Sequence, residues 1–541
     1  MKLRLRAMHG RLRPVDLLDA PISIGRHPGN ALCLQDDRVS RHHCVIEPDD
    51  AGGFRIRDLD SRNGIRLNGE PVLHAPLRSG DVLRVGATEF IVEAVDNGLT
   101  AEPAPDLDLD RLPSAEAAPA WLKELMRILK DLPPKRDYAE RVVLIAADGK
   151  TSQVLDAPGE GPSAVKALMR IASKARATDI HVEPKAQAVH VRMRVDGQMV
   201  WIAELPPRVG ELAVGLIRTA CHMKPAARDA VQDGHFSCSL DDRRVEFRVS
   251  LTPSVHGQKS VIRILDSRDI PHALDDLGLA PYMLDRIRRT CRQDQGLLLV
   301  CGPTGSGKTT TLYNALREID RHSKNVVTIE DPVEYTLDGT TQLPVDEARG
   351  KSFGELLRSV LRQDPDVILV GEIRDEETAR TAMQAAMTGH LVFSTVHAKD
   401  SIAAVFRLLD LKVEPYLVAS SLDLVLAQRL VRVLCDNCKR AVAVTPTEST
   451  RMGRFLQSRA SLYHPVGCAK CLATGFRGRR AIFELLDVND ELRDVILKEP
   501  GIQAMKRVIE QGLFTTLVQS GWRLAADGLT SLDEVDRVAG T

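Results

Sequence analysis

The feature that most constrains this chain is a glycine-rich loop between a strand-like run and a helix-like run. The loop reads GPTGSGKT over 302–309, and it follows the apolar run LLLV and precedes TTTLYNALREI. Its glycines allow consecutive backbone N–H groups to turn toward one anion, and the N-terminus of the next helix adds its positive end. The pattern therefore predicts a phosphate-binding loop of the Walker A type in an α/β domain.

Two side chains of the loop carry its chemistry. Lys308 is placed to reach the outer phosphates, and the Thr309 hydroxyl is placed to hold Mg²⁺. A chance match to the loop pattern is less frequent when a strand must precede it and a helix must follow it, as they do here. The residues predicted to bind the nucleotide are Gly302, Thr304, Gly305, Ser306, Gly307, Lys308, Thr309 and Thr310.

Length and composition limit the rest of the protein. A chain of 541 residues should hold about three to four domains. Its 73 Lys and Arg against 74 Asp and Glu argue against a surface built to grip nucleic acid, although local basic patches remain possible. No apolar run reaches the roughly 18 residues of a bilayer span, and the N-terminus lacks the apolar core of a secretory signal. We therefore expect a cytoplasmic protein.

Changes in composition divide the chain into six segments. Short strand-like runs broken by Gly, Asn, Asp and Pro predict a β-sandwich, and an Ala, Pro and acid-rich stretch predicts a linker. An α+β segment, an α/β segment of alternating strands and helices, a cysteine-bearing segment and a helical tail follow. The expected boundaries are 1–98, 99–120, 121–268, 269–430, 431–485 and 486–541.

Acidic and histidine side chains follow or flank the strands of the α/β segment. They lie in NVVTIEDPVEY, DVILVGEIRD and TGHLVFSTVHA, and nucleotide sites form where parallel strands end. Glu372 is predicted to hold Mg²⁺ and water with help from Glu330, because phosphoryl transfer needs both functions. Any one of these residues alone is more often a solvated strand end or a core histidine. The full set is Glu330, Asp331, Glu334, Glu372, His390 and His397.

These motifs together resemble the ATPases of type II secretion and type IV pilus assembly. The resemblance is carried by GPTGSGKTT, IEDPVEY, LRQDPDVILVGEIRD and TGHLVFSTVHA, preceded by ATDIHVEP, VRMRVDG and FRVSLTPSVHGQKSVIRIL. It implies ATP hydrolysis in a hexameric ring, with the α+β segment as part of the working unit. It also implies a place at the cytoplasmic face of the inner membrane, through an inner-membrane platform protein. Within it, Glu330, Asp331 and Glu334 match the Asp box, Glu372 the Walker B motif, and His390 and His397 the His box.

Arginines add to the predicted site. Arg358 and Arg362 lie four residues apart on an expected helix, and Arg374 follows Glu372 closely. Arg248 and Arg263 match positions that resemble the family's phosphate-directed arginines, a role that suits a permanently charged, planar group. Each arginine taken alone would more often form a surface salt bridge.

Four cysteines form two CxxC pairs in the loop-rich tail. Four thiolates can close a tetrahedral zinc site, whereas a redox motif would need one pair beside a thioredoxin-like βαβ unit. The surrounding GCAKCLATGFRGRRAIFELL resembles the metal-binding subdomain of the assembly ATPases, which favours an assembly or secretion motor over a retraction motor. The predicted zinc ligands are Cys435, Cys438, Cys468 and Cys471.

The N-terminal turns carry a separate pattern. SRHH over 40–43 and DLDSRNGIRLNG over 58–69 resemble the forkhead-associated (FHA) domain, a β-sandwich that binds phosphothreonine peptides. His43 is expected to stabilise its loop, and Arg62 stands where the family commonly has Thr. A sandwich that serves only as a docking surface is the alternative. The resemblance implies that Arg26, Ser40, Arg41 and Asn63 bind the phosphopeptide.

The combined interpretation is a Mg²⁺-dependent ring ATPase that drives a secretion or pilus machine and recognises a phosphorylated partner. Two alternatives stay open: a phosphopeptide-binding regulator with a silent nucleotide site, and a DNA-transfer ATPase. The balanced charge disfavours the DNA-transfer ATPase. The choice between secretion and pilus assembly, the cargo and the kinase are not encoded in these motifs.

Overall fold

The computed structural model describes residues 3–7, 15–17, 21–94, 118–133 and 142–540. Short gaps lie at 28–29, 35, 37, 50–52, 225–228, 241–242, 267–269, 457–458 and 499. The predicted linker over 99–120 lies outside the described residues except for 118–120. The chain forms two compact units, 1–104 and 105–541, and each is described by itself.

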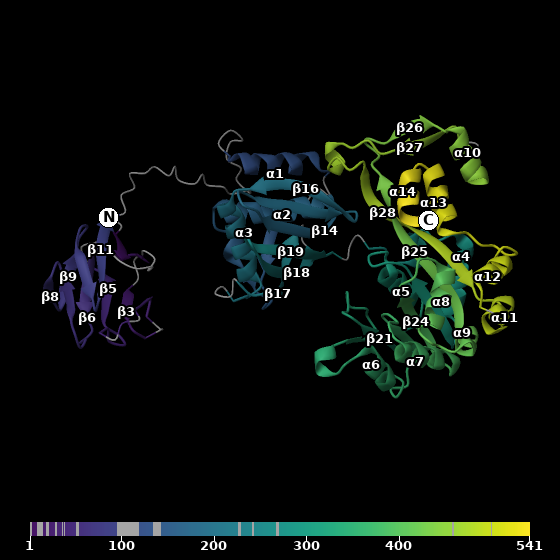
Figure 1. Ribbon diagram of the computed structural model, residues 1–541, viewed down its shortest axis with the longest axis horizontal. Coiled ribbons are helices and arrows are strands. Elements are labelled where there is room, and N and C mark those ends of the chain that lie inside the picture. The colour runs from purple at the N-terminus through teal and green to yellow at the C-terminus, as the bar shows by residue number, and fades with distance from the viewer. Residues whose placement is uncertain are drawn as a thin grey trace. The chain divides into compact units, whose positions relative to one another are not determined.

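The first unit is a β-sandwich of two sheets. One has the order β2-β1-β11-β10-β7-β8 and the other β4-β3-β5-β6-β9 (Figure 1). Alternating side chains of both sheets, such as Leu5, Ile24 and Ile56, are buried in one shared core. The strands are β1 (Leu3–Ala7), β2 (Val15–Asp16), β3 (Ile22–Gly25), β4 (Leu32–Cys33), β5 (Cys44–Pro48), β6 (Phe54–Asp58), β7 (Ile65–Leu67), β8 (Glu70–Val72), β9 (His74–Leu77), β10 (Val82–Val85) and β11 (Thr88–Ala94).

The second unit begins with an α+β domain. An antiparallel sheet has the order β13-β12-β17-β18-β19-β14-β15-β16, and helices α1, α2 and α3 contact it. Along β14, Ile180 and Val182 are buried in the core, whereas Asp179, His181 and Glu183 alternate with them and face the other side. The elements are α1 (Ala120–Asp131), β12 (Val142–Ile145), β13 (Thr151–Ser152), α2 (Glu160–Ala175), β14 (Ala177–Pro184), β15 (Val189–Val195), β16 (Gln198–Leu205), α3 (Pro207–Ala220), β17 (Gln232–Leu240), β18 (Arg243–Ser254) and β19 (Gly257–Leu265).

The α/β segment contains the sheet that carries the phosphate loop. Its strand order is β22-β21-β23-β24-β20-β25-β28, and all neighbours pair in parallel except β25 and β28. Every residue of β20 is buried: alternate residues pack with α6–α9 on one face and with α4 and α5 on the other. The strands are β20 (Gly296–Cys301), β21 (Val326–Glu330), β22 (Thr341–Pro344), β23 (Val367–Val370), β24 (Leu391–Val396), β25 (Leu422–Leu434) and β28 (Phe476–Asp487).

Helices connect these strands as the sequence predicted for an α/β domain. In Figure 1 they flank the sheet from α4 to α9. They are α4 (Pro281–Cys291), α5 (Lys308–Arg317), α6 (Phe353–Val360), α7 (Glu376–Met387), α8 (Ser401–Asp410) and α9 (Pro415–Ser421).

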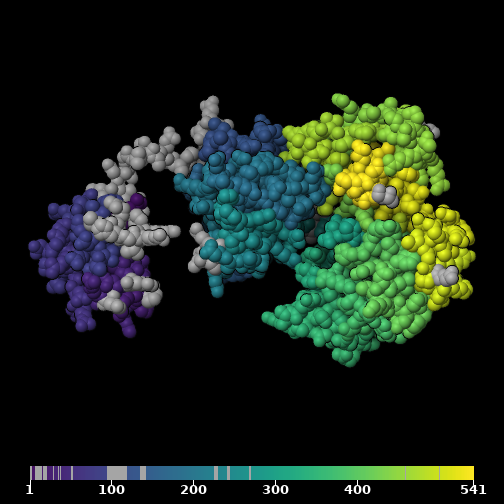
Figure 2. Space-filling view, viewed as in Figure 1, coloured from purple at the N-terminus to yellow at the C-terminus, as the bar shows by residue number. Residues whose placement is uncertain are grey.

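The cysteine segment and the helical tail attach to the same sheet. β25 runs through the expected boundary at 430–431, and β28 returns from the cysteine segment into the sheet beside β25. The yellow C-terminal helices lie against the green α/β segment in Figure 2. The remaining elements are β26 (Arg440–Ala443), α10 (Pro446–Met452), β27 (Ser461–His464), η6 (Ala469–Cys471), α11 (Asp490–Lys498), α12 (Ile502–Ile509), α13 (Leu517–Ala526) and α14 (Leu532–Ala539). None of the helices that the structure describes has both the length and the apolar composition of a membrane span.

Candidate functional site

The phosphate loop has the backbone that its glycines predict. Gly305 and Gly307 have φ of +78° and +88°, values that favour glycine, and α5 begins directly after them at Lys308. A Cβ at Gly302 would lie 2.5 Å from the backbone oxygen of Gln428, so this position also excludes a side chain. The loop thus connects a buried strand to a helix N-terminus, as a phosphate cradle requires.

Lys308 lies over this loop. Its Nζ donates to the backbone oxygens of Gly302 at 3.0 Å and Pro303 at 3.3 Å. Burial lowers the pKa of this ammonium, and the positive charge of Arg429 lowers it further. An anion bound in the phosphate loop would therefore contact the Lys308 ammonium, which is already held over the loop.

Gln428 is a residue of the site that the sequence analysis did not identify. Its side chain is buried, its Nε2 donates to the Ser306 backbone oxygen at 2.7 Å, and its Oε1 accepts from Thr311 Oγ1 at 2.6 Å. It therefore fixes the loop and its helix to β25. The available signal was one amide inside the apolar run LDLVLAQRLVRVL, since a buried polar group needs partners.

Glu372 and His397 meet at the same end of the sheet. Glu372 Oε2 lies 3.4 Å from His397 Nε2, and Glu372 also pairs with Arg374. Burial lowers the pKa of His397, and the charges of Lys308 and Arg374 act in the same direction. The structure thus brings together Lys308, Glu372 and His397 from three different strand ends.

The Asp-box acids lie in different environments. Glu330 is buried, and its carboxylate accepts from Thr328 Oγ1 at 2.5 Å, from Gln342 Nε2 at 3.1 Å and from the Tyr313 hydroxyl. Asp331 and Glu334 are exposed, and Asp331 Oδ2 lies 3.6 Å from Arg374. The described contacts tie Glu330 to α5 through Tyr313, and a direct part for it in water activation stays a prediction.

His390 is not brought to this site. It precedes β24, and its Nδ1 lies 3.1 Å from the Ala385 backbone oxygen. His397 follows the same strand, so six extended residues, about 20 Å, separate the two histidines. The two histidines therefore lie at opposite edges of the sheet, as their predicted places on either side of the strand imply, and a part for His390 in catalysis stays a prediction.

The predicted arginines form three groups. Arg374 lies beside Glu372 and Asp331. Arg358 pairs with Glu377, and Arg362 Nη1 donates to the Arg358 backbone oxygen at 2.8 Å. α6 ends at Val360, so Arg362 follows the helix that was expected to include it. Arg248 and Arg263 lie opposite each other on β18 and β19 and line one groove of the α+β domain.

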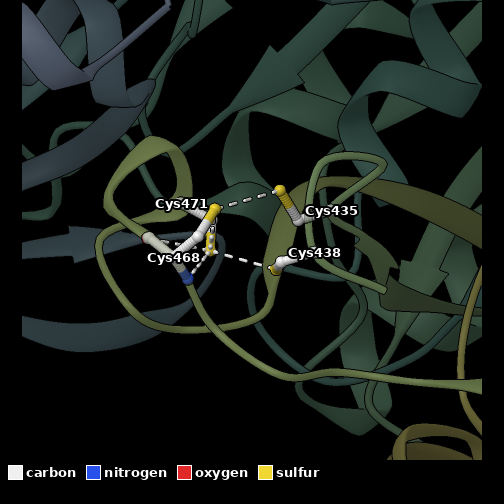
Figure 3. Close-up of side chains that lie close together, drawn as sticks. All are labelled: Cys435, Cys438, Cys468 and Cys471. Atoms are coloured by element: carbon white, nitrogen blue, oxygen red, sulfur yellow. Dashed lines mark hydrogen bonds between the residues drawn. The ribbon is translucent and has the colours of Figure 1, made fainter. Parts of the chain in front are cut away.

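The four predicted zinc ligands form one cluster, shown in Figure 3. Their Sγ atoms all lie within 4.8 Å of one another, and the contacts Cys435–Cys468, Cys438–Cys471 and Cys468–Cys471 measure 3.9, 3.9 and 3.7 Å. A zinc ion with four Zn–S bonds of about 2.3 Å has sulfur atoms about 3.8 Å apart. These three separations match those of a tetrahedral zinc site, so the cluster is compatible with zinc.

The thiols of the cluster differ in acidity. Burial raises the pKa of Cys435 to about 12. At Cys468 burial also acts upward, but hydrogen bonds from Asn437 and Cys471 outweigh it and lower the pKa to about 7. The hydrogen bonds at Cys468 therefore favour its thiolate, the form that binds a metal ion.

In the N-terminal sandwich, the predicted phosphopeptide residues lie on adjacent loops. The Arg26 N–H donates to the Ser40 backbone oxygen at 2.9 Å, and the Ser40 Oγ accepts from the Arg62 N–H at 3.1 Å. The side chains of Arg26 and Arg41 are exposed, and Asn63 Nδ2 donates to the Arg38 backbone oxygen at 2.7 Å. Backbone N–H groups of Arg26 and Arg62 therefore join these loops at Ser40.

Two buried side chains hold these loops. His43 accepts from the Ser40 N–H at 3.0 Å and its other ring nitrogen lies 3.1 Å from the Gly64 oxygen, which is the stabilising role predicted for it. Asn30, which the sequence analysis did not identify, donates from Nδ2 to the Arg41 oxygen at 2.7 Å. Both residues therefore keep these loops in place.

Comparison with known families now decides the identity of the chain. Residues 159–537 match the Type II/IV secretion system protein family, which is more than half of the sequence. The chain belongs to this family. Residues 22–86 match the FHA domain, so both resemblances inferred from the motifs are confirmed.

Individual members of the family agree. The chain is 39% identical over 417 residues to the type II secretion system protein E of Aeromonas hydrophila, covering 77% of this chain and 82% of that protein. It is 40% identical over 374 residues to the type II secretion system ATPase E of Vibrio cholerae, covering 69% and 74%. The structure of the Legionella pneumophila ATPase DotB shares the fold, with a TM-score of 0.53 and 20% identity over 69% of this chain and 94% of that one. This member of the family is an ATPase.

Proposed function

We propose that the chain is a Mg²⁺-dependent ATPase that works as a ring to drive a type II secretion or type IV pilus assembly machine. The observation that carries the proposal is the convergence of Lys308, Glu372 and His397 on the phosphate loop. Lys308 would bind the outer phosphates, and Thr309 would hold Mg²⁺. Glu372 would orient the attacking water, since its carboxylate lies beside a histidine of lowered pKa.

Loss of Lys308 tests this function. Lys308→Ala should reduce phosphate release by at least about 100-fold, because the variant loses the only loop cation aimed at the outer phosphates. Release of inorganic phosphate from ATP with Mg²⁺ is the measurement, and Lys324→Ala is the matched control, since Lys324 pairs with Asp294 on the surface of the same domain. Equal turnover in the parent and in Lys308→Ala would contradict ATP hydrolysis at this loop. The alternative of a silent nucleotide site would then remain.

The ring is part of the proposal. Arg248 and Arg263 belong to the α+β domain, and the described contacts do not bring them to the phosphate loop of the same chain. A neighbouring subunit or a closure of the domains would complete the site. The mass of the particle with a non-hydrolysable nucleotide tests the ring, and DNA-stimulated turnover would instead favour a DNA-transfer ATPase.

The cysteine cluster is proposed to hold structural zinc. Four thiolates leave no open position for a substrate, so the metal would shape the segment and not take part in hydrolysis.

The sandwich is proposed to recruit the motor to a phosphothreonine-bearing partner at the cytoplasmic face of the inner membrane, where a platform protein would receive the mechanical work. Arg26 and Arg41 would bind the phosphate as paired guanidinium groups, with Ser40 as a hydroxyl donor and Asn63 on the peptide backbone. Arg62 would add charge where the family commonly has Thr.

A peptide titration tests the recruitment role. Arg41→Ala should weaken binding of phosphothreonine peptides at least about 10-fold, because charge-assisted hydrogen bonds to the phosphate are lost. Arg57→Ala is the control, since Arg57 lies on β6, where it pairs with Glu47. Equal affinity of the sandwich for phosphorylated and unphosphorylated peptides would leave only a docking role.

A further inference from the structure

The uncovered face of the α+β sheet carries a row of charged side chains across its strands. Strand register places one acidic residue in this row between basic ones. Asp179 on β14 is opposite Arg194 on β15 and opposite Arg263 on β19, and Arg263 is opposite Arg248 on β18. Across the four strands, the row therefore reads Arg194, Asp179, Arg263 and Arg248, that is, cation, anion, cation, cation.

The Asp179 carboxylate is held in place by several contacts. Asp179 is 6% exposed, and its Oδ2 accepts from Thr178 Oγ1 at 2.8 Å. Its Oδ1 accepts from Arg263 Nε at 3.2 Å, and its Oδ2 lies 3.6 Å from Arg194 Nε. A carboxylate with so many partners cannot turn without losing several contacts.

The contact uses only one edge of the Arg263 guanidinium. Nε is engaged by Asp179, and in the described part of the chain neither η nitrogen of Arg263 makes a hydrogen bond. The Arg263 side chain is 67% exposed, so its η nitrogens point their N–H groups outward. A forked pair of donors on a held guanidinium is the geometry that suits phosphate oxygens.

Arg248 makes this restraint necessary. Two guanidinium groups directly opposite each other on neighbouring strands repel. Without the carboxylate, Arg263 would turn away from Arg248 and spread over several rotamers. With it, the guanidinium keeps one orientation.

We propose that Asp179 is a positioning residue that aims the η nitrogens of Arg263 at the terminal phosphate of ATP. The inference rests on the proposed function, in which Arg263 is directed at that phosphate. Asp179 itself touches no phosphate. It lowers the barrier by fixing the guanidinium before the transition state forms, and a small misplacement of such a group costs rate, not substrate binding.

The same strand offers a matched control. Glu183 lies on the same face of β14, is 5% exposed, and pairs with Arg192 at 2.7 Å and Lys259 at 3.0 Å. It equals Asp179 in burial and in the number of its cationic partners. Neither partner matches a phosphate-directed position. Substitution of Glu183 therefore measures the effect of losing a buried carboxylate while the orientation of Arg263 is kept.

The experiment compares phosphate release by the full chain with ATP and Mg²⁺. Asp179→Asn should lower kcat by at least about 10-fold and leave KM within about threefold. Glu183→Gln should keep kcat within about threefold. Asp179→Glu retains the charge but displaces the carboxylate by one methylene, so it should also lower kcat. Thermal unfolding shows whether each variant is folded. If Asp179→Asn does not fold, the kcat of Asp179→Glu decides the test.

A double substitution that includes Arg263 completes the test. In an Arg263→Ala background, Asp179→Asn should cause little further loss, because its effect passes through Arg263. Equal losses in Asp179→Asn and Glu183→Gln, full activity of Asp179→Glu, or additive losses with Arg263→Ala would each overturn the inference. Parental turnover in Arg263→Ala alone would instead show that the proposed role of this arginine is wrong.

Discussion

Glu534 shows at the residue scale how a charge can be buried in this fold. Its side chain is fully buried and accepts hydrogen bonds from Arg432 Nη2 at 2.7 Å and from Arg537 Nε at 2.7 Å. Burial alone would raise its pKa, but these bonds outweigh burial and lower the pKa to about 2. Arg432 also donates to Gln198 of the α+β domain, so one carboxylate connects α14, β25 and β16.

The pH dependence of stability follows from this carboxylate. A depressed pKa stabilises the folded chain above the ordinary value of 4.5, and this contribution is lost as the pH falls toward 2. Glu534→Gln should destabilise the second unit on the order of 3 kcal/mol near neutral pH, because the largely buried Arg432 guanidinium loses its counter-charge and the exposed Arg537 loses its partner. Thermal unfolding at several pH values should show this difference shrinking below pH 4.5. The exposed Glu510→Gln is the control, and a difference that does not depend on pH would contradict the assignment.

Site residues were predictable from sequence where a motif fixes a backbone. The glycines around Lys308 and the two CxxC pairs specify local geometry, and the structure places both sets as expected. Gln428 could not be assigned, because its partners lie more than a hundred positions away along the chain. The sequence also placed His390 and His397 on either side of one strand, and β24 separates them in the structure.

At the scale of elements, the strands around the cysteines matter most. Cys435 follows β25 directly, and Cys471 Sγ accepts from the Gly475 N–H at 3.3 Å just before β28. The cluster therefore holds together the two longest strands of the ATPase sheet where they leave it. Leu472, next to Cys471, packs against the core of the α+β domain.

Removal of one thiol tests the zinc assignment. Cys468→Ser should reduce bound zinc from about one ion per chain to near none, because three thiolates hold the ion more weakly than four. The unfolding temperature of the second unit should fall, since metal binding contributes folding free energy. Metal analysis of purified protein measures the first effect, with Cys33→Ser of the sandwich as control. Stoichiometric zinc in Cys468→Ser would contradict a four-cysteine site.

The order of strands and helices was predictable, whereas where the domains end was harder to infer. Alternating apolar strands and helices marked the α/β domain, because both faces of its sheet are covered. The cysteine segment looked separate by composition. Long-range pairing of β25 with β28 nevertheless makes it an extension of the ATPase sheet, and such pairing leaves no local trace in the sequence.

At the scale of the whole molecule, the sandwich and the rest of the chain are two compact units with separate cores. The core of the sandwich consists only of residues from the first unit, and 105–541 form a unit of their own. A variant that starts at Ala118 should therefore keep ATP turnover within about twofold of the parent. Phosphate release by the two proteins is the measurement, and a large loss would show that the sandwich takes part in hydrolysis.

Separate cores have an evolutionary consequence. Under the proposed function, substitutions in the loops around Ser40 would alter which phosphorylated partner is bound and leave the packing of the phosphate loop untouched. Selection could then exchange the partner through one module without altering the core of the other.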